Sequence, residues 1–73
     1  MQWRRGRVMT LSEAERRVDA IREMAGDAES AHSEEDAFRH EVLRAIASGH
    51  ENPVALAQIA LYTSTIKFPR WCA

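Results

Sequence analysis

The chain has 73 residues, a formal net charge of −1 and a single cysteine, and these values exclude several kinds of protein. A chain of this length holds one domain with a thin core, in the size range where folding often depends on a disulfide, a metal or an oligomer. One cysteine cannot form an intramolecular disulfide, and no apolar run approaches the ~20 residues needed to span a bilayer. We therefore expect one small cytoplasmic domain.

The small net charge conceals an uneven distribution of charged residues. Residues 1–8 contain three arginines and no acid, residues 9–51 contain five basic and eleven acidic residues, and residues 52–73 contain two basic residues and no acid. The acidic middle argues against duplex binding, because phosphate contacts need clustered Lys or Arg. A nucleic-acid-associated regulator that uses the basic N-terminus is therefore the alternative hypothesis rather than the preferred one.

Residues 1–9 lack a hydrophobic period, so we predict a basic, disordered leader followed by a single helical domain over residues 10–73. Trp3 lies among the arginines of this leader, a combination that single-stranded nucleic-acid binders also use. Helix start signals follow Met9 directly, which favours the leader interpretation.

The first helix is predicted to begin at a capping box formed by Thr10 and Glu13, or two residues later at Ser12. Gly26 is expected to end it in the left-handed conformation, and Asp27 to cap the next helix. Between them, apolar residues step by three and four positions along one face: Leu11, Ala14, Val18, Ile21 and Ala25.

A second helix is predicted from Ala28 to Ser48, with a start at Ser33 as the alternative. Gly49 is expected to close this helix as its C-cap residue. Its apolar stripe is expected to contain Ala28, Ala31, Phe38, Val42, Ala45 and Ile46, with His32 and Glu35 along the edge.

The third helix is predicted from Pro53 to about Thr63. Asn52 is expected to cap it, and proline at the first helical position loses only an amide that had no partner. The helix is so apolar that we expect it at the centre of the fold, buried on more than one side. Together these elements predict an all-α domain of three helices, with an apolar C-terminal tail packed on the helices.

Two features of the sequence are candidates for catalysis or metal binding. His32, Asp36 and His40 recur every four residues and could hold a divalent metal, but the spacing is unspecific and no further ligand is identifiable. Cys72 follows Arg70 closely, yet no base is evident beside it. We expect a solvated polar row, a passive thiol, no cofactor and no enzyme activity.

The C-terminal tail supports two interpretations. In the first, Ile66, Phe68 and Trp71 complete the core of the protein itself, which a short chain needs. In the second, Phe68, Arg70 and Trp71 are partner-binding residues, because Trp and Arg are enriched at interface hot spots. Both interpretations hold together in a homodimer, and we favour the first for the packing of the tail.

Several sequence features resemble those of small uncharacterised helical proteins of actinobacteria and their phages. The features are the run from His40 to Ala47, the Asn52-Pro53 pair, the alanine-rich third helix and the ending Phe68-x-Arg70-Trp71-Cys72-Ala73. The resemblance covers roughly Thr10 to Ala73 and implies no activity. We expect a non-catalytic protein–protein interaction module, in a narrower form a phage or prophage accessory protein that binds a host protein.

Overall fold

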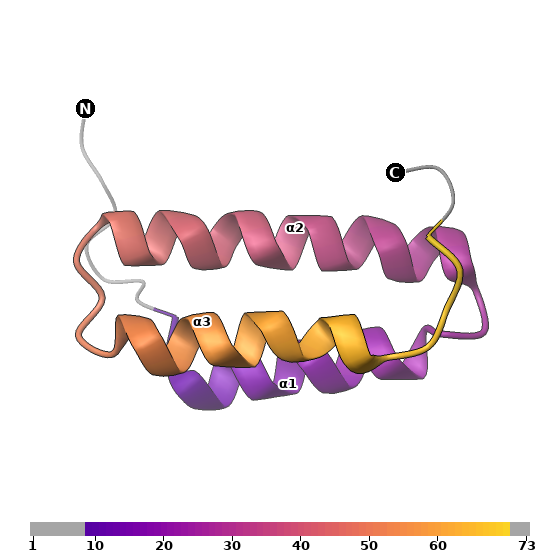
Figure 1. Cartoon of the computed structure of the whole chain (residues 1–73), viewed down its shortest axis with the longest axis horizontal. Helices are drawn as coiled ribbons and strands as arrows, with labels where there is room; N and C mark the ends of the chain where they lie inside the picture. The colour runs from indigo at the N-terminus through magenta and orange to yellow at the C-terminus, as the bar shows by residue number, and fades with distance from the viewer. Residues whose placement is uncertain (1–8, 71–73) are drawn as a thin grey trace.

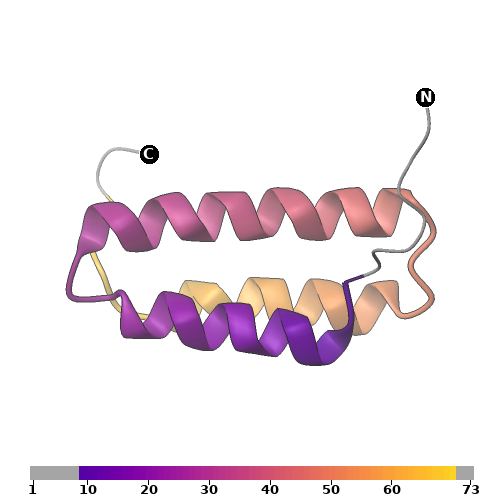
Figure 2. The same ribbon diagram turned by 180° about the vertical axis from the view of Figure 1, so that it is seen from behind.

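The computed structural model describes residues 9–70, which form three α-helices and a short 3-10 turn. The elements are α1 (Leu11–Glu23), α2 (Ala28–Ala47), α3 (Pro53–Tyr62) and the turn η1 (Thr63–Thr65). The helices lie side by side along the longest axis, and α2 runs antiparallel to both α1 and α3 (Figures 1 and 2). No strand occurs in residues 9–70, so the predicted all-α fold is confirmed.

The start of α1 is the predicted capping box. The Glu13 amide donates to the Thr10 hydroxyl at 3.0 Å, and the Thr10 amide donates to a Glu13 carboxylate oxygen at 3.0 Å. The prediction for Gly26 is wrong, since Gly49 is the only residue with positive φ among residues 9–70. The chain leaves α1 through right-handed turns instead, in which the Asp27 amide donates to the Met24 carbonyl at 2.8 Å.

Both ends of α2 are as predicted for the longer helix. Asp27 caps it by accepting a hydrogen bond from the Ser30 amide at 3.3 Å. At the other end Gly49 has a φ of 92°, and its amide donates to the Ile46 carbonyl. The His50 amide donates to the Ala45 carbonyl, which completes a Schellman motif and turns the chain toward α3.

The start of α3 differs from the prediction in one respect. Pro53 is the first helical residue, but the Asn52 side chain makes no capping hydrogen bond. The Asn52 amide donates to His50 Nδ1 at 2.9 Å, and His50 Nε2 lies 2.7 Å from the Met9 carbonyl oxygen. Because Pro53 has no amide hydrogen, the first turn of α3 has one donor fewer that needs a cap.

The core lies where the three helices meet, and the tail closes one end of it. Phe38 is its largest fully buried side chain, and Ile66 and Phe68 of the tail are 6% and 8% exposed, so these two tail residues belong to the core. Trp71 lies outside the described residues. The buried hydrophobic residues are Ala14, Val18, Ile21, Ala31, Phe38, Val42, Leu56, Ala60, Ile66 and Phe68.

The prediction that α3 is buried on more than one side is wrong. Only Leu56 and Ala60 of this helix are buried, whereas Val54, Leu61 and Tyr62 are exposed. In a three-helix bundle each helix turns one face toward its two neighbours. No further element among residues 9–70 covers the outer face of α3 (Figure 1).

Candidate interaction surface

After η1 the chain crosses the end of the bundle and returns to α2, where Arg70 meets Glu35 (Figure 1). Arg70 Nε donates to Glu35 Oε1 at 2.9 Å, and Nη2 donates to Oε2 at 3.2 Å. The Glu35 side chain is 2% exposed. This two-pronged ion pair, which we call the Arg70 clasp, joins the tail to the middle of α2.

The other donors of Arg70 are directed at backbone carbonyls. Nη2 also donates to the carbonyl oxygens of Thr63 at 3.0 Å and Ile66 at 3.1 Å, and Nη1 donates to that of Phe68 at 3.3 Å. The guanidinium lies over the Phe68 ring, 3.9 Å from its centroid. One cation therefore satisfies the carbonyls of the tail and neutralises the buried carboxylate.

A second arginine supports the same carboxylate from within α2. Arg39 Nη2 lies 3.4 Å from Glu35 Oε2 and donates to the hydroxyls of Thr63 and Ser64 at 2.8 Å each. Among residues 9–70, no buried side-chain nitrogen or oxygen lacks a hydrogen-bond partner. Glu35 therefore belongs to a structural network in which its buried carboxylate is paired with two arginines.

The predicted place of Glu35 at the edge of α2 is wrong, because its side chain is buried. Burial alone raises the pKa of the Glu35 carboxyl, but hydrogen bonding to Arg70 and Thr63 and the charges of Arg39 and Arg70 outweigh it. The net effect lowers the pKa of this carboxyl below its ordinary value, so Glu35 is ionised at neutral pH.

This lowered pKa predicts acid sensitivity. The unfolded chain binds the Glu35 proton at a higher pH than the folded chain, so stability is full above the ordinary value of 4.5 and falls as the pH drops further. Urea unfolding at a series of pH values should show this decline, and Glu35→Gln should make it shallower. Equal slopes for the two proteins between neutral and strongly acidic pH would contradict the assignment.

Two of the three residues predicted to bind a partner, Phe68 and Arg70, make contacts within the protein. The Phe68 ring is in the core, and Arg70 forms the clasp while its side chain stays 30% exposed. Phe68 becomes accessible to a partner only if the tail leaves the bundle. Trp71 is outside the described residues, and partner binding by Phe68, Arg70 and Trp71 stays a prediction.

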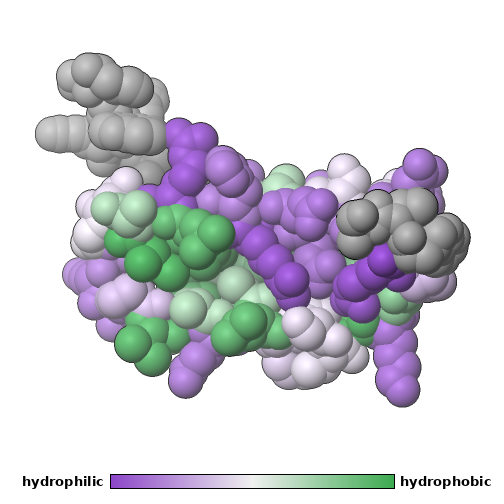
Figure 3. Space-filling view, turned by 45° about the horizontal axis from the view of Figure 1, so that its top comes forward, coloured by the Kyte–Doolittle hydropathy of each residue, from purple (hydrophilic) through white to green (hydrophobic). Residues whose placement is uncertain are grey.

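A separate surface exposes large apolar side chains to water. Leu43 of α2 and Val54 and Leu61 of α3 are 65%, 70% and 66% exposed. We call these three residues the α2–α3 apolar face. Figure 3 shows hydrophobic side chains gathered over this side of the molecule. An exposed apolar patch on a small protein often marks an interaction site.

Helical register explains why these residues share a side. Val54 and Leu61 are seven residues apart, two turns along the outer line of α3, and Ala57 lies between them. Arg39 reaches from α2 to Ser64, just beyond the end of α3. Leu43 lies one turn after Arg39 and therefore on the same flank of α2, the one beside α3. Tyr62, the other large exposed apolar residue, lies toward α1, where Arg22 stands 5.6 Å from its ring centroid.

The predicted polar row is partly assembled. His32 Nε2 lies 3.6 Å from Asp36 Oδ2, and Asp36 and His40 are exposed. No group of three His, Cys, Asp or Glu residues suited to a metal occurs in residues 9–70. Asp36 and His40 therefore lie on the solvent-facing surface of α2.

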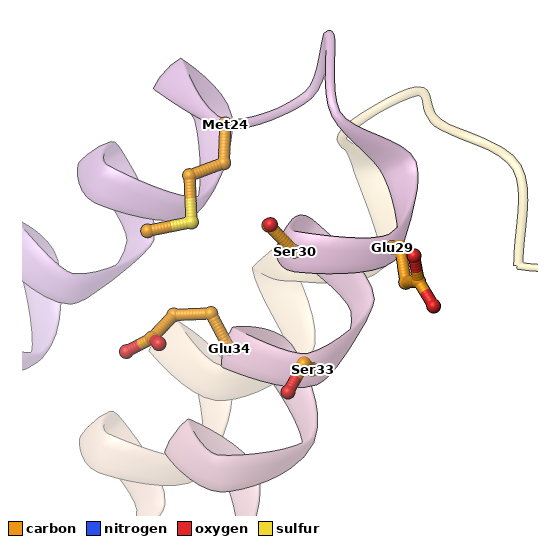
Figure 4. A pocket seen from close by; sticks show the side chains of 5 residues that line it. All are labelled: Met24, Glu29, Ser30, Ser33 and Glu34. Carbon is orange, nitrogen blue, oxygen red and sulfur yellow. The ribbon is translucent and has the colours of Figure 1, made fainter.

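An open hollow lies between the end of α1 and the start of α2 (Figure 4). In the close-up Ser30 and Glu34 point toward Met24, whereas Glu29 and Ser33 point away from it. The Ser30 hydroxyl donates to Asp27 Oδ2 at 2.9 Å and serves the helix cap. The five lining residues are one methionine, two glutamates and two serines, and Glu34 lies 3.5 Å from Arg17 of α1.

Sequence reasoning missed both main surface features. The Glu35–Arg70 pair joins residues 35 positions apart, and no local pattern announces it. The sequence does carry a sign of the apolar face, since Val54 and Leu61 are two turns apart in a helix without a charged residue. The same pattern also fits a buried helix, which is the interpretation that the sequence favours.

Comparison with known proteins adds no relative: no family model matches the chain, and no curated protein and no solved structure matches it. No helix in residues 9–70 is both long enough and apolar enough to cross a membrane.

Proposed function

We propose that the protein is a non-catalytic protein–protein interaction module whose docking surface is the α2–α3 apolar face. The observation that carries this proposal is the exposure of Leu43, Val54 and Leu61 on one side of a stable bundle. Apolar surface left in water favours association, because its burial releases about 25 cal/mol per Å². A helical scaffold also presents these side chains in fixed positions, so little ordering is needed on binding.

The Arg70 clasp, at the end of the bundle that the tail crosses, supports this function. It anchors the tail to α2 and so holds the end of α3 against the bundle. In this proposal Phe68 and Arg70 hold the tail in place and so position the surface. Trp71 is a candidate partner-binding residue outside that surface. We also propose a cytoplasmic location, because a chain with a single cysteine suits a reducing compartment.

The narrower form of the proposal is a phage or prophage accessory protein that binds a host protein. It rests on the sequence resemblance alone. Both forms predict the same binding surface and are tested by the same variants.

Affinity capture with the full chain as bait tests the proposed function. Leu61→Glu places a carboxylate on the α2–α3 apolar face and is expected to abolish capture of a specific partner, because a charge buried without a pair opposes docking. Trp71→Ala, used in parallel, reports on the tail. The measurement is the set of proteins retained from a lysate of the source organism.

The matched control is Ala37→Glu, which introduces the same side chain at an exposed position of α2 remote from α3. It should retain the partner. Equal capture by the wild type and Leu61→Glu, with loss only in Trp71→Ala, would move the docking surface to the tail and refute the assignment of the apolar face.

A further inference from the structure

Resting on the proposed function, we propose that the occupant of the α2–α3 apolar face is a second copy of this chain, with the two α3 helices packed antiparallel across a two-fold axis. Four observations carry it: the symmetry of the outer line of α3, the charges that flank this helix, the exposed apolar area, and the thin core of the single chain.

The outer line of α3 is nearly symmetric about its own midpoint. Val54 lies three residues before Ala57, and Leu61 lies three residues after Gln58. In an antiparallel pair centred between Ala57 and Gln58, Val54 of each copy faces Leu61 of the other. A large side chain thus meets a large one at each end of the seam, and the small Ala57 and the exposed Gln58 lie beside the axis.

The charges around α3 fit the same arrangement. No charged residue occurs between Glu51 and Lys67, so the seam has no like charges to bring together. Both flanking residues are exposed. Antiparallel packing brings Glu51 of one copy to the end of the seam where Lys67 of the second copy lies, and a parallel arrangement would instead place like charges together.

The exposed area suits the centre of a symmetric interface. With exposed fractions of 65%, 70% and 66%, the three side chains of the face present an apolar area on the order of a few hundred Å². A stable interface buries roughly 800 Å² per partner, with an apolar centre and a polar rim. The face supplies that centre, and the flanks of α2 and α3 beside it supply the rim.

The composition of the core gives a reason for a second copy. Three of the ten buried hydrophobic residues are alanines, namely Ala14, Ala31 and Ala60. A chain of this size with a single cysteine has no intramolecular disulfide to supplement such a core. Packing two apolar faces together adds a second apolar interface on the outer side of α3, with helices packed as in a helix bundle.

Sedimentation equilibrium of the full chain over a range of concentrations tests self-association. The mass should rise toward twice the 8.3 kDa of one chain, and the melting temperature should rise with concentration. Leu61→Glu should weaken the dimer by about tenfold or more, whereas the control Ala37→Glu should not. Circular dichroism establishes that both variants keep their helices.

The register is tested by disulfide trapping in a Cys72→Ser background. Ala57→Cys places a thiol close to the proposed axis and should yield a covalent dimer under mild oxidation, since a disulfide needs Cα atoms about 4.4 to 6.8 Å apart. Ala37→Cys, on the outward side of α2, should cross-link far more slowly.

A monomer at every concentration would overturn the self-association proposal, while capture of a different protein through Leu61 would still support the interaction function. A dimer that Leu61→Glu leaves unchanged would overturn it as well, because another surface would then join the copies. A dimer that Leu61→Glu weakens, but in which Ala57→Cys cross-links no faster than Ala37→Cys, would refute the antiparallel register.

Discussion

Replacing Arg70 with methionine is expected to lower the free energy of unfolding by about 3 kcal/mol. The change leaves the carboxylate of Glu35 buried with only Arg39 nearby, and breaking a buried ion pair by removing one partner is strongly destabilising. It also removes the hydrogen bonds that Arg70 donates to the Thr63, Ile66 and Phe68 carbonyls. Urea unfolding followed by circular dichroism measures the loss.

The double variant Glu35→Met/Arg70→Met is the control for this explanation. Removing both charges replaces the ion pair with apolar packing, which is often neutral or even stabilising. We expect the double variant to recover most of the stability that Arg70→Met loses. If the two losses were additive instead, the cost would lie in the guanidinium contact with the Phe68 ring and in the carbonyl hydrogen bonds, and not in the ion pair.

Replacing Phe38 with alanine is expected to cost about 3 to 5 kcal/mol, which is a large part of the stability of a domain this small. Phe38 is fully buried and is the largest side chain of the core, and Arg17 of α1 stands 5.3 Å from its ring centroid. The variant leaves a cavity in the core of the bundle. Thermal melting should show a chain that is largely unfolded.

Leu61→Ala is the matched control, since it also truncates a large apolar side chain of a helix. Because Leu61 is 66% exposed, the bundle should lose no more than about 0.5 kcal/mol when measured as a dilute monomer. A loss comparable to that of Phe38→Ala at low concentration would show that Leu61 packs against something within the same chain.

Local signals predicted the helices well. The capping box of Thr10 and Glu13, the cap at Asp27 and the positive φ of Gly49 depend on a few neighbouring residues, which is why spacing alone identifies them. Gly26 failed because its role depends on how sharply the chain must turn into α2. That geometry is set by helix packing and not by the residues of the turn.

The surfaces were harder to predict because they depend on what lies beside each helix. An apolar helix in isolation gives the same pattern whether it is enclosed or faces water, so α3 was expected to be central although Val54 and Leu61 are exposed. Glu35 looked like an edge residue because acids are rarely buried, and only the distant Arg70 makes its burial possible.

The Arg70 clasp also bears on how the chain folds as it is made. A ribosome delivers the N-terminal part first, so α2 with Glu35 emerges before Arg70, which follows 35 residues later. Until Arg70 has left the exit tunnel, docking of α2 would enclose a carboxylate without its main counter-ion. The ion pair of Glu35 can therefore be completed only after Arg70 has emerged, so the tail makes its contact with α2 later than the other helices can.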